Sequence, residues 1–228
     1  KTMKARLFNL ITAVCLLLAC LASTQLNAAD KYWGGGLLDI ANGTPLPYDT
    51  NALVGTWNDT LKNWAASPDG ATYTTFADGD HIQLGYYTNL NNTTITLEND
   101  FEIAGMQGSM NAITGGFNWL YQVRALSAKT LTPVSGGALF NVVAQDATRG
   151  FQLQNNVSLA GSAPVTKVGN GKFELTANNN AYTGVINVRQ GNFAVSSAGS
   201  LNGVQEINCV GRVTLATTSG NGGNDFGF

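Results

Sequence analysis

The sequence predicts an all-β protein whose strands coil into a parallel β-helix, and three observations lead to this prediction. Charged residues make up only 11% of the chain while 27 residues are glycine, a balance that suits short strands joined by turns. Apolar and polar residues alternate over segments of three to six residues, which places one face of each strand in a core. Similar segments also recur about every 20 residues.

The alternating segments begin at His81, and each ends in turn residues. In chain order they are HIQLG, TTITLEND, FEIAG, KTLTPV, LFNVV and FQLQNN. Helical periodicity is nearly absent after residue 28. We therefore predict a β-helix over residues 81–228. Because the sequence ends within the repeating pattern, we also expect it to be a fragment that is truncated at the C-terminus.

The repeat is clearest where glycine precedes a strand. Gly-x-Phe-x-Leu at 171–175, Gly-x-Phe-x-Val at 191–195 and Gly-x-Val-x-Leu at 211–215 follow one another at a constant period. Phe151 precedes Phe173 by a slightly longer interval, and a second strand recurs with nearly the same period at 186–188 and 207–209. This spacing predicts that Phe173, Phe193 and Val213 stack inside successive turns of the coil, while Lys172, Asn192 and Arg212 point outward.

The N-terminus has the order of a secretory signal peptide. Lys1, Lys4 and Arg6 precede an almost uninterrupted apolar run over 7–21, and Ala28 and Ala29 offer small residues for cleavage. We therefore predict a signal helix over residues 1–28 and export of the rest. The alternative is a membrane anchor, but the run is shorter than the roughly 20 residues that a spanning helix needs.

Export changes the charge and the cysteine content of the chain. Cleavage removes three positive charges, so the formal net charge falls from −2 to −5, which gives no electrostatic reason to bind nucleic acid or anionic lipid. Two of the three cysteines, Cys15 and Cys20, lie in the signal segment. Cys209 is left alone and occupies the place held by Val188 one repeat earlier, so we predict that it is a small buried apolar residue.

Residues 29–80 are rich in tryptophan and in turn residues, and we predict that they form an N-terminal cap. A β-helix must cover its first turn, because strand edges and core are otherwise exposed there. Trp33, Trp57 and Trp64 most simply form an apolar plug. The alternative is an exposed aromatic platform for sugars.

The stretch from 166 to 195, TKVGNGKFELTANNNAYTGVINVRQGNFAV, resembles the autotransporter-associated β-strand repeat. That family follows T-K-x-G-x-G-x-L-x-L with N-x-Y-T-G, another strand and G-x-L-x-V. The residues that match this pattern are Thr166, Lys167, Gly169, Gly171, Leu175, Asn180, Tyr182, Thr183, Gly184, Val188, Gly191 and Val195. Phe173 and Phe193 replace the usual leucines. The resemblance implies an exported, right-handed β-helix passenger of the cell surface or outer membrane, commonly followed by a membrane barrel or a sorting tail.

Few residues in the chain have the chemistry of a catalytic or metal site. His81, the one histidine, follows Asp78 and Asp80, which serve equally well as turn residues. The carboxylates of the two aspartates, or GNGGND at 220–225, are the least implausible calcium ligands, and neither is strong. We therefore predict no catalytic residue, no cofactor and no metal site.

The favoured hypothesis is a non-enzymatic, exported β-solenoid that acts as a stalk or an adhesin-like passenger. Its predicted partners are surface glycans or other cells, with no nucleic acid, and with contact to membrane only through the signal peptide or a missing C-terminal anchor. One alternative is a β-helix carbohydrate-active enzyme such as a polysaccharide lyase. The basic residues that an acidic polysaccharide would need are scattered: Arg124, Lys129, Arg149, Lys167, Lys172, Arg189 and Arg212. A third hypothesis is an envelope protein with lipid on Cys20.

Overall fold

The computed structural model describes residues 28–34, 55–67, 72–84, 93–110, 120–144, 150–177, 181–195, 201–210 and 213–217. Over these residues the chain is all-β, and its strands form three mainly parallel sheets, as expected for a β-solenoid. The signal helix predicted over residues 1–28 lies outside the described residues except for Ala28. Asn178–Asn180, Arg212 and the GNGGND stretch are also outside them.

Sheet A contains nine of the described strands. In spatial order they are β18 (Glu206–Cys209), β16 (Val185–Val188), β14 (Val165–Val168), β11 (Ala138–Ala144), β8 (Gly105–Met110), β5 (His81–Leu84), β1 (Asp30–Trp33), β3 (Trp64–Ala65) and β4 (Tyr73–Thr74). All neighbours pair in parallel except β1 with β3 and β3 with β4, which are antiparallel. The antiparallel strands therefore lie at the end of sheet A that comes first in the sequence.

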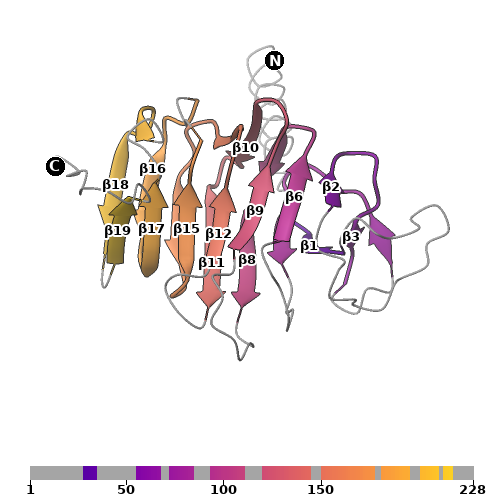
Figure 1. Cartoon of the computed structure of the whole chain (residues 1–228), viewed down its shortest axis with the longest axis horizontal. Coiled ribbons are helices and arrows are strands. Elements are labelled where there is room, and N and C mark those ends of the chain that lie inside the picture. The colour runs from indigo at the N-terminus through magenta and orange to yellow at the C-terminus, as the bar shows by residue number, and fades with distance from the viewer. Residues whose placement is uncertain are drawn as a thin grey trace, which may run out of the picture.

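Two smaller sheets complete the architecture. Sheet B contains, in spatial order, β19 (Val213–Thr217), β17 (Gly191–Val195), β15 (Lys172–Leu175), β12 (Gly150–Leu153), β9 (Leu120–Arg124), β6 (Thr93–Leu97) and β2 (Gly55–Trp57). Sheet C contains β13 (Val157–Leu159), β10 (Lys129–Pro133) and β7 (Phe101–Ile103). From β5 to β13 the chain visits sheets A, B and C in turn, and from β14 to β19 the described strands alternate between sheets A and B. We call each such passage a rung. Figure 1 shows the strands side by side, from β1 and β3 at one end to β18 and β19 at the other.

The core is filled by the inward side chains of each rung. In β5, Ile82 and Leu84 are buried while His81 and Gln83 are half-buried on the outer face, as alternation along a strand requires. Aromatic rings continue the core between rungs: Phe140 stacks on Phe173 with ring centroids 4.6 Å apart, and Phe173 lies 5.9 Å from Phe193. The inward prediction for Phe173 and Phe193 is confirmed, since both are buried.

The register confirms three of the strand alignments expected from the sequence. Phe151 pairs with Phe173, Phe173 with Phe193, and Val188 with Cys209. The pairing of Phe193 with Val213 is wrong, because Phe193 pairs with Leu215. The cause is the corner between sheets A and B. Two residues separate Val188 from Gly191, whereas three separate their register partners Cys209 and Val213, so the spacing in sheet B lengthens on this rung.

The predicted tryptophan plug is confirmed, and the exposed aromatic platform is wrong. Trp33, Trp57 and Trp64 are each at most 2% exposed. Trp57 stacks on Phe101 of β7 at 5.1 Å and meets Trp64 edge-on at 5.1 Å. Such aromatic pairs add to the stability gained from burial. The cluster thus joins the strands that come first in the sequence to the first complete rung.

Candidate functional site

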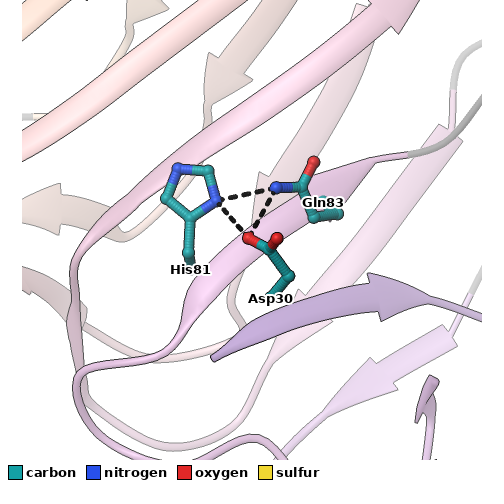
Figure 2. A network of polar contacts seen from close by, with 3 residues as sticks. All are labelled: Asp30, His81 and Gln83. Carbon is teal, nitrogen blue, oxygen red and sulfur yellow. Dashed lines mark hydrogen bonds and ion pairs between the residues drawn. The ribbon is translucent and has the colours of Figure 1, made fainter. Parts of the chain in front are cut away.

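His81 lies in a network of polar groups on the outer face of sheet A. Asp30 of β1 and His81 of β5 are register partners, and Gln83 follows two positions later on the same face. Gln83 Nε2 donates to Asp30 Oδ1 at 2.8 Å and lies 2.9 Å from His81 Nδ1, which is 3.3 Å from Asp30 Oδ1 (Figure 2). The two amide hydrogens of Gln83 suit a neutral imidazole whose Nδ1 accepts, with the proton on Nε2.

The electrostatics of this network favour a neutral histidine. Burial lowers the pKa of His81, and the nearby carboxylate of Asp30 opposes that shift without overcoming it. The Asp30 side chain is 54% exposed, so water screens its charge. The network therefore links β1 to β5 by hydrogen bonds from an outward position.

The two aspartates that precede His81 in the sequence, Asp78 and Asp80, bond to other groups. Asp80 Oδ2 accepts from the Ala77 N–H at 2.9 Å and lies 3.7 Å from Lys31 Nζ. Asp78 Oδ1 accepts from the Glu102 N–H at 2.8 Å. Their turn interpretation is confirmed, and the carboxylate beside His81 is Asp30, which only the pairing of β1 with β5 brings near.

Lys167 is the most deeply buried charged group in the described part of the chain. It lies on the inward face of β14, has no exposed surface, and points toward the corner that leads to β15. Its Nζ donates to the carbonyl oxygens of Gly169 at 2.5 Å, Gly171 at 2.6 Å and Gln190 at 2.8 Å. An ammonium has three hydrogens, so each carbonyl receives one.

The buried amine and a glycine fit together at this corner. Burial lowers the pKa of Lys167 to about 8, which still leaves the group charged at neutral pH. Gly191 has a φ of 77°, and a Cβ there would lie 2.6 Å from Lys167 Nζ and 2.7 Å from Gly171 O. The matched T-K-x-G-x-G pattern thus places an internal cation among backbone oxygens, and Lys167 is not one of the scattered surface charges.

Tyr182 plays a comparable part at the position where sheet C would continue. Its ring is buried, and its hydroxyl is shared between the carbonyls of Ala163 at 3.1 Å and Val185 at 2.9 Å. Burial raises the pKa of Tyr182 to about 12. A Cβ at Gly184 would lie 2.6 Å from the Tyr182 hydroxyl, so the glycine makes room for it.

The prediction that Cys209 is buried is wrong. Its backbone is in register with the buried Val188, but its side chain is exposed. Glu206 and Val210 of the same segment are exposed too, and Ile207 is only partly buried. The core that shields Val188 between two rungs is therefore less complete around Cys209.

The other basic residues differ in their surroundings. Lys172 points outward as predicted and makes an ion pair with Glu174 Oε2 at 2.7 Å. Arg124 and Arg189 are exposed at the ends of β9 and β16. They belong to sheets B and A respectively, so the described basic residues do not gather on one face.

A groove crosses the outer face of sheet A beside Arg189. Its volume is about 260 Å³, and its lining residues are Ala104, Gly136, Gly137, Ala138, Leu139, Pro164, Thr166 and Arg189. Leu139 and Thr166 are register partners on β11 and β14 and form its floor, while the Gly136–Gly137 turn and Pro164 stand at the corner from sheet C. Composition and spacing offered no sign of this groove, because its residues come from four rungs.

The described ranges contain no group of three or more His, Cys, Asp or Glu side chains placed to hold a metal ion. The two aspartates weighed as calcium ligands bond instead to the backbone. Within the same ranges, no helix has the length and apolar character that a membrane span requires.

Comparison with known proteins found no matching protein family, no matching curated protein and no matching solved structure.

Proposed function

We propose that this chain is an exported, non-enzymatic β-solenoid that serves as a stalk or adhesin-like passenger at the cell surface or outer envelope. In this proposal the rungs form a right-handed parallel β-helix, residues 29–80 cap its first turn, and residues 1–28 are the export signal. The observation that carries the proposal is the parallel register between successive rungs. It makes each rung a support for the next, so length is gained by adding similar units.

The distribution of apolar and polar side chains between the inward and outward faces supports a structural role. Inward positions hold apolar residues, and the internal polar groups Lys167 and Tyr182 bond to backbone carbonyls at corners. Outward positions on sheet A hold neutral polar groups such as Gln83 and Asn187. A face of this kind suits contact with other surfaces through hydrogen bonds, and the resemblance to autotransporter-associated repeats points the same way.

The export part of the proposal is tested by the mass of the protein that leaves the cytoplasm. The full chain with a C-terminal tag is expressed in a bacterium, and envelope and medium fractions are analysed by intact mass spectrometry. We expect cleavage after Ala28 or Ala29 and digestion of the tagged protein by protease added to intact cells. Retention of residues 7–21 contradicts this, and lipid on Cys20 favours a lipid-anchored envelope protein.

The same purified protein separates the scaffold from a carbohydrate-active enzyme. It is incubated with acidic and neutral polysaccharides, and product chain length is followed by chromatography. We expect no shortening. Cleavage that a His81→Gln variant loses would replace the scaffold proposal by a polysaccharide lyase or hydrolase.

A further inference from the structure

The groove on sheet A combines an exposed apolar side chain, a hydroxyl and a cation within a small space. Leu139 is 44% exposed, an unusual position for leucine on an outward face. Thr166 is its register partner on the next rung. Arg189 lines the other side, and no described carboxylate makes an ion pair with it.

The backbone holds Arg189 firmly beside the groove. The Arg189 N–H donates to the carbonyl of Lys167 at 2.9 Å, which continues the pairing of β16 with β14 beyond the strand. The next residue, Gln190, accepts a hydrogen bond from Lys167 Nζ at 2.8 Å. Lys167 therefore tethers the backbone at Arg189 and at Gln190, so the main chain that carries the guanidinium needs no ordering when an anion binds.

The groove also has open room at its corner. A Cβ at Gly136 would meet no atom within 4 Å, whereas one at Gly137, whose φ is 92°, would lie 2.6 Å from the Pro164 carbonyl. Gly137 is therefore required by the turn. Gly136 leaves the space beside Leu139 and Thr166 unfilled, and the total of about 260 Å³ suits one sugar-sized group rather than a drug-sized ligand.

The position of the groove disfavours a peptide that would add as a strand. The groove lies over β11, β14 and the end of β16, which are interior strands of sheet A with neighbours on both sides. Their backbone N–H and C=O groups are used in the ladder, so β-strand addition has no free edge here. Recognition must come from side chains, namely a guanidinium, a hydroxyl and an apolar surface.

We propose that this groove binds a carboxylate-bearing sugar residue, such as a uronic acid, of a surface glycan. The Arg189 guanidinium matches the carboxylate in a bidentate pair. Thr166 hydrogen-bonds a sugar hydroxyl, and Leu139 covers a C–H face of the ring. Asn187, the register partner of Thr166, extends the polar row toward the next sugar along the chain. The inference rests on the proposed function, because it names the ligand class of the displayed surface.

The test is equilibrium binding of the full purified chain to a tetragalacturonate, followed by calorimetry and by NMR shifts of the sugar. Three matched probes define the chemistry: the methyl ester of the same tetrasaccharide, a neutral tetrasaccharide, and an acidic tetrapeptide. We expect the uronate to bind and the uncharged sugars to bind at least about tenfold more weakly, since hydrogen bonds between charged groups are the stronger ones.

Variants locate the site without depending on one substitution. Arg189→Gln should weaken uronate binding at least about tenfold, and Arg189→Lys should weaken it less, because lysine keeps the charge without the bidentate fork. Gly136→Gln should weaken it by filling the space. Arg124→Gln, at an exposed arginine on sheet B, is the control and should leave affinity unchanged. Circular dichroism confirms that each variant is folded.

Each other outcome overturns the inference. Equal binding of the uronate and its ester would show that charge is not recognised, and tighter binding of the peptide would assign the groove to proteins. Loss of affinity in Arg124→Gln but not in Arg189→Gln would move the site to sheet B. No binding of any probe would refute the groove as a glycan site. The proposed function would still be tested separately, by the export experiment described above.

Discussion

Lys167 shows how one residue can fix a corner of the fold. A buried cation is costly unless its hydrogen-bonding groups are satisfied. Here three backbone carbonyls from two rungs accept its three hydrogens, so the amine ties the strand it belongs to, the following corner and the next rung together. Without the Lys167 amine, these three carbonyls would each lose a hydrogen-bond donor.

Replacing this amine should cost stability, and the cost should depend on pH. Lys167→Met should lower the free energy of unfolding by about 2–4 kcal/mol at neutral pH, since carbonyls lose their donor while the burial of a charge is relieved. Between about pH 8 and 10.5, the unfolded chain retains a proton that the folded chain has released, so this lysine makes wild-type stability rise with pH. The loss caused by Lys167→Met should therefore grow across that interval.

Denaturant unfolding of the wild type and the variant near pH 7 and near pH 10 measures this dependence. Lys62→Met removes an exposed lysine and is the control for loss of a solvated charge. An equal loss for Lys167→Met at both pH values would contradict the desolvation of the amine.

At the residue level the sequence predicted apolar stacking better than polar contacts. Phe173 and Phe193 could be placed because alternation and spacing are local signals. The partner of His81 could not be predicted from the sequence, because Asp30 is distant along the chain and comes near His81 only through the pairing of β1 with β5. The inward position of Lys167 could in principle be predicted, because alternation along β14 places it on the same face as the apolar Val165. Val168 is also apolar but lies on the outward face, so the apolar residues of this strand do not indicate one buried face.

Between elements, the corners rather than the strands set the register. The corner from β16 to β17 contains the two residues 189–190, and it closes over the Lys167 amine. Register partners are already 21 residues apart in sheet A, as with Val188 and Cys209, and the corner from β18 to β19 is longer than that from β16 to β17 by one residue. Phe193 therefore pairs 22 residues on, with Leu215 and not Val213. A repeat read from strand residues alone misses this change, because a shift of two positions keeps the same alternation.

Two glycines at corners allow a matched test of this role. Gly191→Ala should destabilise the protein by about 1–3 kcal/mol or more, because alanine is strained at a φ of 77° and its Cβ would press on Lys167 Nζ and Gly171 O. Gly136→Ala should be neutral or slightly stabilising, since its Cβ enters open space and the unfolded chain loses freedom. Thermal or denaturant unfolding compares them, and a larger loss for Gly136→Ala would argue against the corner geometry.

For the whole molecule, stacked rungs imply that damage stays near its source. From β5 onward, each strand of sheets A and B pairs with the strands of adjacent rungs. Strand β3, which contains Trp64, lies far along the stack from β17, which contains Phe193 (Figure 1). Stability in such a stack is a sum of units and nearest-neighbour contacts. The sequence could predict this stacking because the period is regular near the C-terminus. It could not predict the much longer interval that separates Gly105 from its register partner Leu139.

Reciprocal substitutions at the two ends test this locality. Trp64→Ala and Phe193→Ala should each cost about 3–5 kcal/mol, the usual loss for a buried aromatic. Hydrogen exchange should show that Trp64→Ala loosens β1 to β5 while β14 to β17 stay protected, and Phe193→Ala should give the reverse. Loss of protection along the entire stack in both variants would mean that the molecule opens as one cooperative unit.

The internal position of Lys167 has a consequence for survival outside the cell. Trypsin-like proteases recognise a basic side chain by drawing it into a pocket of their own, and here that side chain has no exposed surface. The peptide bond after Lys167 lies within β14, paired on both sides. The residue that ties two rungs together therefore offers no cleavage site while the rungs are closed, and a cut there reports that they have opened.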